Sequence, residues 1–396
     1  MLDSFDILLY ALVLPAVMET LHLTRARAGL LGSLTLVAAA VGGVLFGLAA
    51  DRWGRTRALM TSVIVYAVFT AACGLAWSFL SLACFRILLG FGMGGEWASG
   101  ASLVAETWGP SHRDKALALM QSSFAVGYAL AAVVAYLLLP RVGWRGVFFV
   151  GLLPALLTVW IRRHVPEPEA WQLARKERSE REGCKERLEL SEGKLQTATA
   201  SDTGLMALFR PPLLSRTVAL TLMNACCMFA WWGFNLWVPS YLSLPAASGG
   251  VALPARTMTL VIVAMQVGMW FGYVSFGYLA TAFGRKRVYV SFLLAAAVLL
   301  VAFARMRSPW LLALLGPCLA FAATGYFSGF AAVTADTYPT RIRSSAQGLT
   351  YNLGRLASAA APYAAGALAQ RGGFGAAFHL DAAAFVLAAA LWLFLP

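Results

Sequence analysis

The chain has 396 residues, of which 60% are hydrophobic and only 12% are charged. Soluble globular proteins carry about 25% charged residues, so this composition excludes a soluble enzyme, a disordered protein and a nucleic-acid-binding protein. The net charge of +13 comes mainly from Lys and Arg in short loops between apolar runs, which is where membrane proteins keep them.

Apolar runs of helical length predict an all-α integral membrane protein with twelve spans in two sets of six. The first set lies near residues 4–22, 28–50, 58–77, 79–104, 115–138 and 145–163. The second set lies near residues 216–243, 256–281, 288–306, 309–335, 346–369 and 374–395.

The loops between these spans predict the orientation of the chain. Lys and Arg gather in the loops on one side, and the positive-inside rule makes that side cytoplasmic. Both termini are then expected in the cytoplasm of a multi-pass inner-membrane protein. The long polar stretch 166–214 is expected to be a cytoplasmic linker between one bundle at 1–165 and a second at 215–396.

The two sets of spans carry an internal repeat at a constant offset of about 230 residues. Gly54 falls on Gly284, Arg55 on Arg285, and Glu106 on Asp336. Repeated parallel halves suit alternating access, in which one half rocks against the other around a central site. The sequence therefore predicts two pseudo-symmetric six-helix bundles.

The loop after the second span reads Gly47-Leu-Ala-Ala-Asp51-Arg52-Trp53-Gly54-Arg55 and resembles the signature loop of the major facilitator superfamily. Its second copy departs from the pattern, because Thr281 stands where the first copy has Asp51. Arginines here can pair with acids on neighbouring spans and hold a cytoplasmic gate shut. The expected gate residues are Gly47, Asp51, Gly54, Arg55, Glu106, Arg113, Arg285, Asp336 and Arg343.

The fourth span holds two charged residues, Arg86 and Glu96, which are costly inside a membrane and need partners. Ten residues of helix separate them by roughly 15 Å, so they cannot pair with each other. No histidine lies deep in a span. Any proton coupling is therefore expected to rest on carboxylates.

The first span opens Asp3-Ser4-Phe5-Asp6, and the sixth closes Val165-Pro166-Glu167-Pro168-Glu169. Together with the fourth span these stretches resemble the sialate/proton symporter family, which includes carriers of sialic acid and lactate. The resemblance implies that Asp6 pairs with Arg86 and that protonation releases the pair. Asp6, Arg86 and Glu96 are thus the expected proton-coupling residues.

Arg355 is expected near the middle of the eleventh span, where a guanidinium needs an anion. A substrate carboxylate would satisfy it through a bidentate contact, and organic-anion carriers of the superfamily resemble this stretch. The alternative is a structural pair with Asp336 or Glu96. Substrate recognition is the favoured interpretation.

The seventh span is rich in aromatic and amide side chains. Trp237 near its end is interpreted as part of the interfacial aromatic belt. Amides and helix breakers inside a span often border a cavity. With Arg355, the expected substrate-binding residues are Asn224, Asn235, Gln121, Tyr128, Gln266, Tyr326 and Asn352.

The sequence predicts a secondary active transporter, a monomer in the bilayer, that takes up a small organic acid with a proton. The acid is expected to be a monocarboxylate such as lactate or sialic acid. A sugar, polyol or aromatic-acid carrier is the alternative within transporters. A membrane sensor or scaffold would need a further soluble domain. Neither a nucleophile–base pair nor a metal cluster is apparent, so no enzyme activity, cofactor or metal is expected.

Overall fold

The structure is a computed structural model that describes residues 2–107, 110–167, 172, 206–209, 213–338 and 343–395. All secondary structure assigned in these residues is helical. The expected linker 166–214 falls mostly outside them, so the proposed division at that segment stays a prediction.

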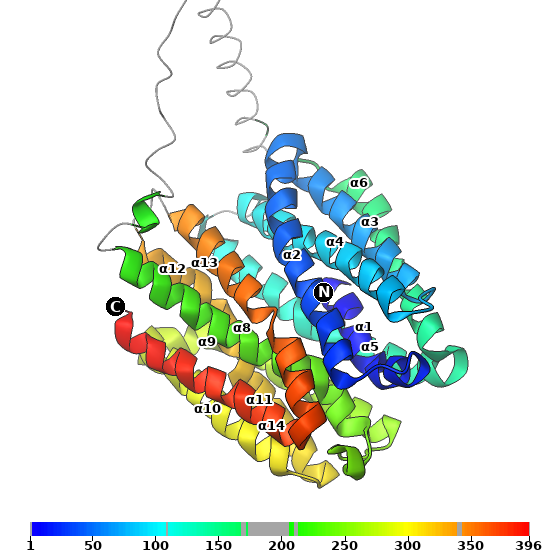
Figure 1. The fold of residues 1–396 in the computed structure, drawn as a ribbon. Helices are drawn as coiled ribbons and strands as arrows, with labels where there is room; N and C mark the ends of the chain where they lie inside the picture. The colour runs from blue at the N-terminus through cyan, green and yellow to red at the C-terminus, as the bar shows by residue number, and fades with distance from the viewer. Residues whose placement is uncertain are drawn as a thin grey trace, which may run out of the picture.

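The N-terminal half consists of α1 to α6, and its helices are long because the apolar runs are long. Their bounds are α1 Leu2–Thr20, α2 Arg25–Trp53, α3 Arg55–Cys73, α4 Phe79–Thr107, α5 Pro110–Val150 and α6 Leu153–His164. α4 packs on α2 and α3, and α1 packs on α5. Figure 1 shows these helices together in blue to teal.

The C-terminal half begins at α8 and follows the same plan. Its main helices are α8 Leu213–Ser243, α9 Ala255–Phe283, α10 Arg285–Arg305, α11 Pro309–Gly325, α12 Phe330–Thr337, α13 Arg343–Ser358 and α14 Ala361–Leu391. Short 3-10 turns are η1 Met206–Phe209, η2 Ala246–Ser248, η3 Tyr326–Gly329 and η4 Trp392–Phe394. α9 packs on α11, and α8 packs on α14.

Glycine breaks repeat between the halves at the offset found in the sequence. Gly54 (φ 117°) separates α2 from α3, and Gly284 (φ 88°) separates α9 from α10. A further pair appears in the structure: Gly143 (φ 65°) kinks α5, and Gly373 (φ 74°) kinks α14. Positive φ is readily adopted only by glycine. The kinks divide two long helices, and the twelve expected spans all fall on described helices.

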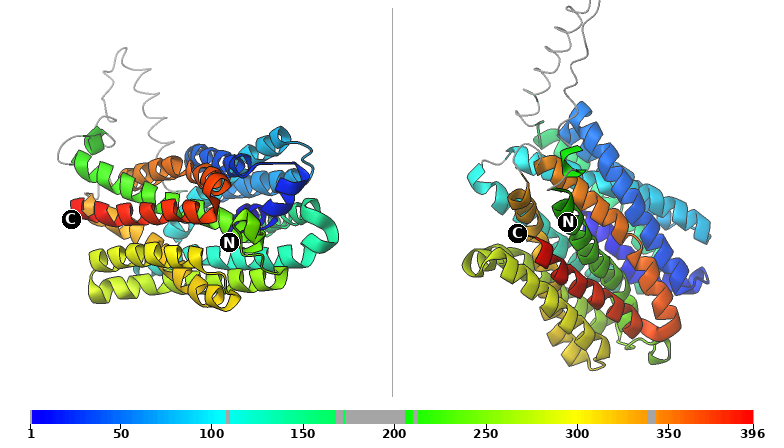
Figure 2. Two further views of the ribbon diagram at one scale, coloured as in Figure 1. Left: turned by 60° about the horizontal axis from the view of Figure 1, so that its bottom comes forward. Right: turned by 60° about the vertical axis from the view of Figure 1, so that its left-hand side comes forward.

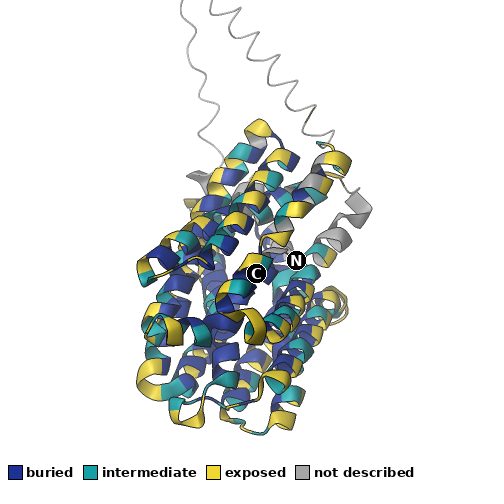
Figure 3. Ribbon diagram, turned by 90° about the vertical axis from the view of Figure 1, so that its right-hand side faces the viewer, coloured by how far each residue is buried: buried dark blue, intermediate teal, exposed yellow. Residues whose placement is uncertain are grey.

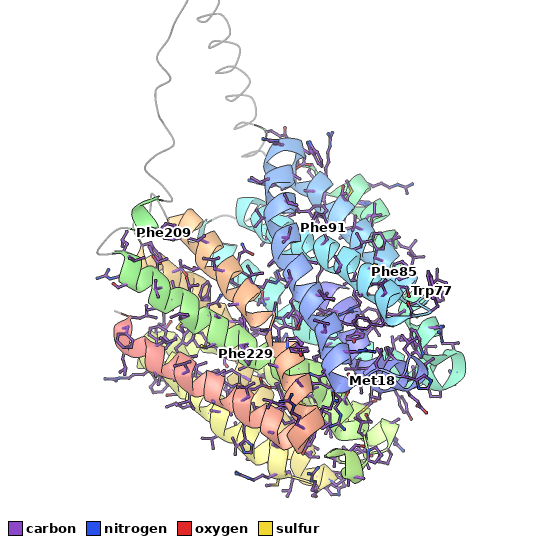
Figure 4. All side chains as sticks on the ribbon, in the orientation of Figure 1. Met18, Trp77, Phe85, Phe91, Phe209 and Phe229 are labelled. Atoms are coloured by element: carbon purple, nitrogen blue, oxygen red, sulfur yellow. The ribbon has the colours of Figure 1, made fainter. Side chains whose placement is uncertain are left out.

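Nine described stretches are long and apolar enough to cross a membrane. Two of them, Leu119–Val150 and Leu349–Phe394, contain the kinks at Gly143 and Gly373. Exposed residues lie along the outside of the bundle (Figure 3). Many of them are large and apolar, as expected for surfaces that contact lipid. Trp77, at the edge of the N-terminal half in Figure 4, is 74% exposed.

The two halves lie side by side (Figure 2). They contact each other through α1 with α8, α2 with α14, and α5 with α9. We call the end at which α1 finishes and α2 begins the far end, and the opposite end, at which α6 finishes and α8 begins, the linker end. At the far end, the Arg25 side chain donates hydrogen bonds to Ala369 O and Ser248 O. The Tyr363 amide donates to Ser33 Oγ at 3.2 Å. The halves are therefore joined at the far end.

Candidate functional site

A cavity with about 60 Å³ of free space lies between the two halves. The N-terminal half lines it from α1, α4 and α5, and the C-terminal half from α8, α9, η3 and α13. The lining residues are Ile7, Met93, Gln121, Phe124, Met228, Trp231, Trp232, Tyr273, Phe327, Tyr351 and Arg355. A site shared by both halves is the place at which rocking would change access.

Arg355 is the charged member of this described lining, and it comes from α13. Its side chain is 8% exposed. The guanidinium forms no hydrogen bond or ion pair with any residue that the structure describes. A buried guanidinium without an acid partner is costly. Such a position suits an anionic ligand, while the alternative pairing with Asp336, whose side chain lies outside the described residues, stays a prediction.

Aromatic rings form most of the remaining wall. Trp231 and Phe327 meet edge to face with centroids 6.1 Å apart. Trp231 and Trp232 are carried by α8, whose high aromatic content is visible in the sequence. Tyr273 and Phe327 had no distinguishing pattern in the sequence, because isolated aromatics inside apolar spans are ordinary packing residues. The cavity combines one positive charge with flat apolar surfaces.

The structure brings two of the eight expected substrate-binding residues, Arg355 and Gln121, to this cavity. The other six lie off its lining. Asn224 donates to the backbone oxygens of Thr350 and Tyr351, at 3.4 and 3.3 Å, and so ties α8 to α13.

The side chains of two more of these six donate hydrogen bonds to backbone carbonyls. Tyr326 donates to Cys227 O at 3.2 Å, and the Gln266 side chain donates to Ile262 O at 3.2 Å. Asn235 and Tyr128 are buried away from the cavity lining, and Asn352 lies on α13 near Gly43. Their roles in binding stay predictions.

The expected interfacial position of Trp237 is wrong. The side chain is fully buried, and its indole nitrogen donates to Pro362 O at 3.0 Å. The ring also packs against Phe374, with centroids 6.0 Å apart. Trp237 therefore joins α8 to α14 inside the C-terminal half instead of facing the membrane interface.

The expected coupling residues lie in the N-terminal half. Asp6 on α1 is 1% exposed and accepts a hydrogen bond from Thr70 Oγ1 at 3.1 Å. Arg86 on α4 is fully buried, and its guanidinium lies 4.1 Å from the Tyr10 ring centroid. Arg86 makes no ion pair with any described residue, so the Asp6–Arg86 pair is not formed here. Glu96 is partly buried, further along α4.

The gate residues are only partly described. Gly54 and Gly284 give the two repeated loops the same positive-φ turn, and Arg55 and Arg285 begin the helices that follow. Asp51, Glu106, Arg113, Asp336 and Arg343 have side chains outside the described set. Pairing between these arginines and acids therefore remains a prediction.

Asp381 is a buried carboxylate that the sequence analysis did not single out. It lies on α14 beyond the Gly373 kink and is fully buried. Neither carboxylate oxygen has a hydrogen-bond partner among the described residues. The carboxyl group packs directly against Gly233 of α8. A lone acid in the middle of an apolar span was the pattern that could have identified it.

Comparison with known proteins places this architecture in a family. The model of the Major Facilitator Superfamily matches residues 1–254 and 242–396. A probable 4-methylmuconolactone transporter of Cupriavidus pinatubonensis is 32% identical over 93% of this chain and 81% of its own. The sialic acid transporter NanX of Escherichia coli is 29% identical over 97% of this chain and 88% of its own.

Solved structures agree on the fold. A D-xylose–proton symporter superposes with a TM-score of 0.76, covering 100% of this chain and 95% of the symporter, at 19% identity. The predicted twelve-span, two-bundle architecture is confirmed, and the chain is a membrane transporter rather than an enzyme. The chain belongs to the Major Facilitator Superfamily.

Proposed function

We propose that this chain carries a small organic acid across the inner membrane together with a proton, and that Arg355 binds the substrate carboxylate. The observation that carries the proposal is a buried guanidinium on the central cavity with no acid partner among the described residues. A carboxylate there gains a charge-assisted hydrogen bond, worth roughly 1.5–3 kcal/mol net. Relatives named as transporters of a muconolactone and of sialic acid support an acidic substrate.

The cavity wall favours a flat, unsaturated acid over a hydroxylated one. Six of its residues are aromatic: Phe124, Trp231, Trp232, Tyr273, Phe327 and Tyr351. Gln121 supplies an amide, and Arg355 supplies the charge. A sugar acid needs a hydrogen-bond partner for each hydroxyl group, because burying an unpaired hydroxyl is costly. An aromatic or conjugated acid needs only the carboxylate contact and a stacking surface. This substrate class is therefore our second candidate, beside the lactate and sialic acid that the sequence analysis expects.

Coupling would use the carboxylates of the N-terminal half. In the proposed cycle Asp6 takes up the proton, with Glu96 as the other acceptor, and Arg86 responds to the change in charge. The 166–214 segment and both termini would lie in the cytoplasm, as the loop charges predict. Asp6→Asn should abolish accumulation against a gradient and leave substrate exchange measurable. Accumulation by Asp6→Asn under an imposed pH gradient would move the coupling role to Glu96.

The deciding experiment compares acids with their amides in proteoliposomes. Uptake of labelled benzoate, nicotinate, lactate and sialic acid is measured with and without a pH gradient. Benzamide should fail to compete with benzoate, because it carries no negative charge. Arg355→Lys keeps the charge but loses the planar contact, so affinity should fall about tenfold or more, which corresponds to about 1.4 kcal/mol. Equal competition by acid and amide, or normal acid affinity in Arg355→Ala, would refute the proposal.

A further inference from the structure

Arg86 presents buried hydrogen-bond donors that no described residue satisfies. The side chain is fully buried, and both Nε and Nη1 lack an acceptor. Its described contact is the face of the Tyr10 ring, 4.1 Å from the guanidinium carbon. The ring offsets part of the charge, but it leaves Nε and Nη1 without an acceptor oxygen among the described residues. Unsatisfied donors of a buried charged group are costly.

The carboxylate expected to pair with Arg86 is engaged elsewhere. Asp6 Oδ2 accepts a hydrogen bond from Thr70 of α3. No ion pair joins Asp6 or any other described acid to Arg86. The guanidinium is therefore suited to an acceptor that arrives from outside the described part of the chain.

Arg86 lines a second cavity that adjoins the first. Its lining also includes Leu8 and Gly32 of the N-terminal half, and Leu236 and Pro362 of the C-terminal half. Ile7 and Trp232 line both this cavity and the Arg355 cavity. The free space beside Arg86 is about 10 Å³, the room of one water molecule. An oxygen atom fits there and a ring does not.

We propose that Arg86 forms a second anion subsite, and that the substrate is a dicarboxylic acid whose far carboxylate binds there. The inference deepens the proposed function and rests on Arg355 as the first anchor. An acceptor oxygen would satisfy the orphaned N–H groups through charge-assisted bonds. A methyl group in the same place would leave them unpaired. Sites built to pair with a polar group reject ligands that lack it more strongly than apolar pockets reject size differences.

Matched pairs of ligands test the second subsite directly. Binding of terephthalate and 4-methylbenzoate, and of isophthalate and 3-methylbenzoate, is measured on the purified carrier by calorimetry. In each pair a methyl group replaces one carboxylate. At least one diacid should bind the wild type about tenfold or more tightly than its partner. Equal or tighter binding of the monoacid in both pairs overturns the proposal.

Substitutions test whether the preference for a diacid over its matched monoacid comes from Arg86. Arg86→Gln should bring the ratio of diacid affinity to monoacid affinity close to one, because only the diacid uses the Arg86 contact. Arg145→Gln is the matched control, because Arg145 packs on Trp144 and bonds to Ala76 O, away from both cavities. An unchanged preference in Arg86→Gln refutes the subsite. If this variant does not fold, the wild-type comparison and Arg86→Lys provide the test.

A separate variant tests the proposed contact between Arg355 and the first carboxylate. Arg355→Gln should weaken all four acids, because every ligand uses that contact. Normal monoacid binding in Arg355→Gln refutes the proposed function. The Arg86 subsite is then tested separately, by the ratio of diacid affinity to monoacid affinity in the wild type and in Arg86→Gln.

Discussion

The guanidinium of Arg25 on α2 donates a hydrogen bond to the carbonyl oxygen of Ala369 on α14, at 2.6 Å, and so joins the two halves at the far end. The same side chain bonds to Ser248 O of η2 at 2.5 Å. Its guanidinium carbon also lies 4.7 Å from the centroid of the Phe374 ring. These partners surround the Gly373 kink, so one arginine fixes the point at which α14 turns.

Loss of Arg25 is expected to shift the transporter toward a state that is open at the far end. Arg25→Ala removes two charge-assisted bonds made across the halves in the closed arrangement. At roughly 1.5–3 kcal/mol for such bonds, the open population should rise by about tenfold or more. The measurement is the labelling rate of a cysteine at Ser33, which faces Tyr363 of the other half, by a membrane-impermeant maleimide.

Arg27→Ala is the control for this experiment. Arg27 lies two residues further along α2, and its side chain is exposed. This variant removes the same charge from the same helix, and no described hydrogen bond joins the Arg27 side chain to the other half. Equal labelling rates in Arg25→Ala, Arg27→Ala and the parent would show that Arg25 does not hold the far end closed.

Glu167, just beyond α6, caps the start of α3 at the linker end. Its carboxylate oxygens accept hydrogen bonds from the backbone amides of Thr56 and Arg57, at 3.1 and 3.2 Å. A carboxylate at a helix N-terminus satisfies free amides and complements the helix dipole. Glu167→Ala should lower the free energy of unfolding by about 1 kcal/mol, seen as a lower thermal unfolding temperature. Glu19→Gln, at an exposed acid on the last turn of α1, should not; a matching loss there would argue against the cap.

The lengths of the apolar runs predicted the architecture well, because membrane spans are long and uniformly apolar. The offset between Gly54 and Gly284 also anticipated a structural repeat, which the kinks at Gly143 and Gly373 extend. Arg355 was identifiable because a charge in mid-span stands out against its surroundings. Asp381 had the same property but lacked a recognisable motif beside it.

The cavity wall was harder to predict. In the sequence, Phe327 and Tyr273 look the same as ordinary packing aromatics. They line the cavity because of the way their helices are oriented, and that orientation depends on contacts between distant segments. Trp237 shows the same limit, because its indole partner, Pro362, lies on another helix. Likewise, the spacing of Asp6 and Arg86 along the chain could not show that Thr70 and Tyr10 would contact them instead.

Asp381 is expected to carry a proton in this structure. An ionised carboxylate without hydrogen-bond donors is costly in the interior of a membrane protein, and neither oxygen has a described partner. Asp381→Asn resembles the protonated acid in shape and charge, so it should change the unfolding temperature little and leave transport near the parent rate. Asp381→Lys should prevent folding, because it places a larger charged side chain against Gly233.

The measurement for Asp381 is infrared difference spectroscopy of the purified carrier. A protonated carboxyl band, shifted in heavy water, should be present in the parent and absent in Asp381→Asn. An unchanged band would mean that Asp381 is ionised and has a partner. A large stability loss in Asp381→Asn would point the same way.

Two glycines lie at close contacts between helices. Substituting them tests the stability of one half separately from the equilibrium between conformational states of the transporter. A Cβ on Gly29 of α2 would lie 2.2 Å from Pro362 O, across the interface between the halves. A Cβ on Gly94 of α4 would lie 2.0 Å from Ala39 O, within the N-terminal half. Both distances are far below van der Waals contact, and both neighbours are backbone atoms that cannot rotate away. The same substitution therefore creates a similar clash in two different places.

Gly94→Ala should destabilise the protein, because α2 and α4 pack together inside one bundle and overpacking there costs typically 1–3 kcal/mol. Gly29→Ala can relieve its clash when the halves part at the far end. It should leave the unfolding temperature close to that of the parent and increase maleimide labelling at Ser33→Cys. Gly277→Ala on α9, where a Cβ meets nothing within 4 Å, serves as the control for adding a methyl group to a membrane-spanning helix. Faster labelling in Gly94→Ala, or a lower unfolding temperature without extra labelling in Gly29→Ala, would contradict rigid-body parting of the halves at this contact.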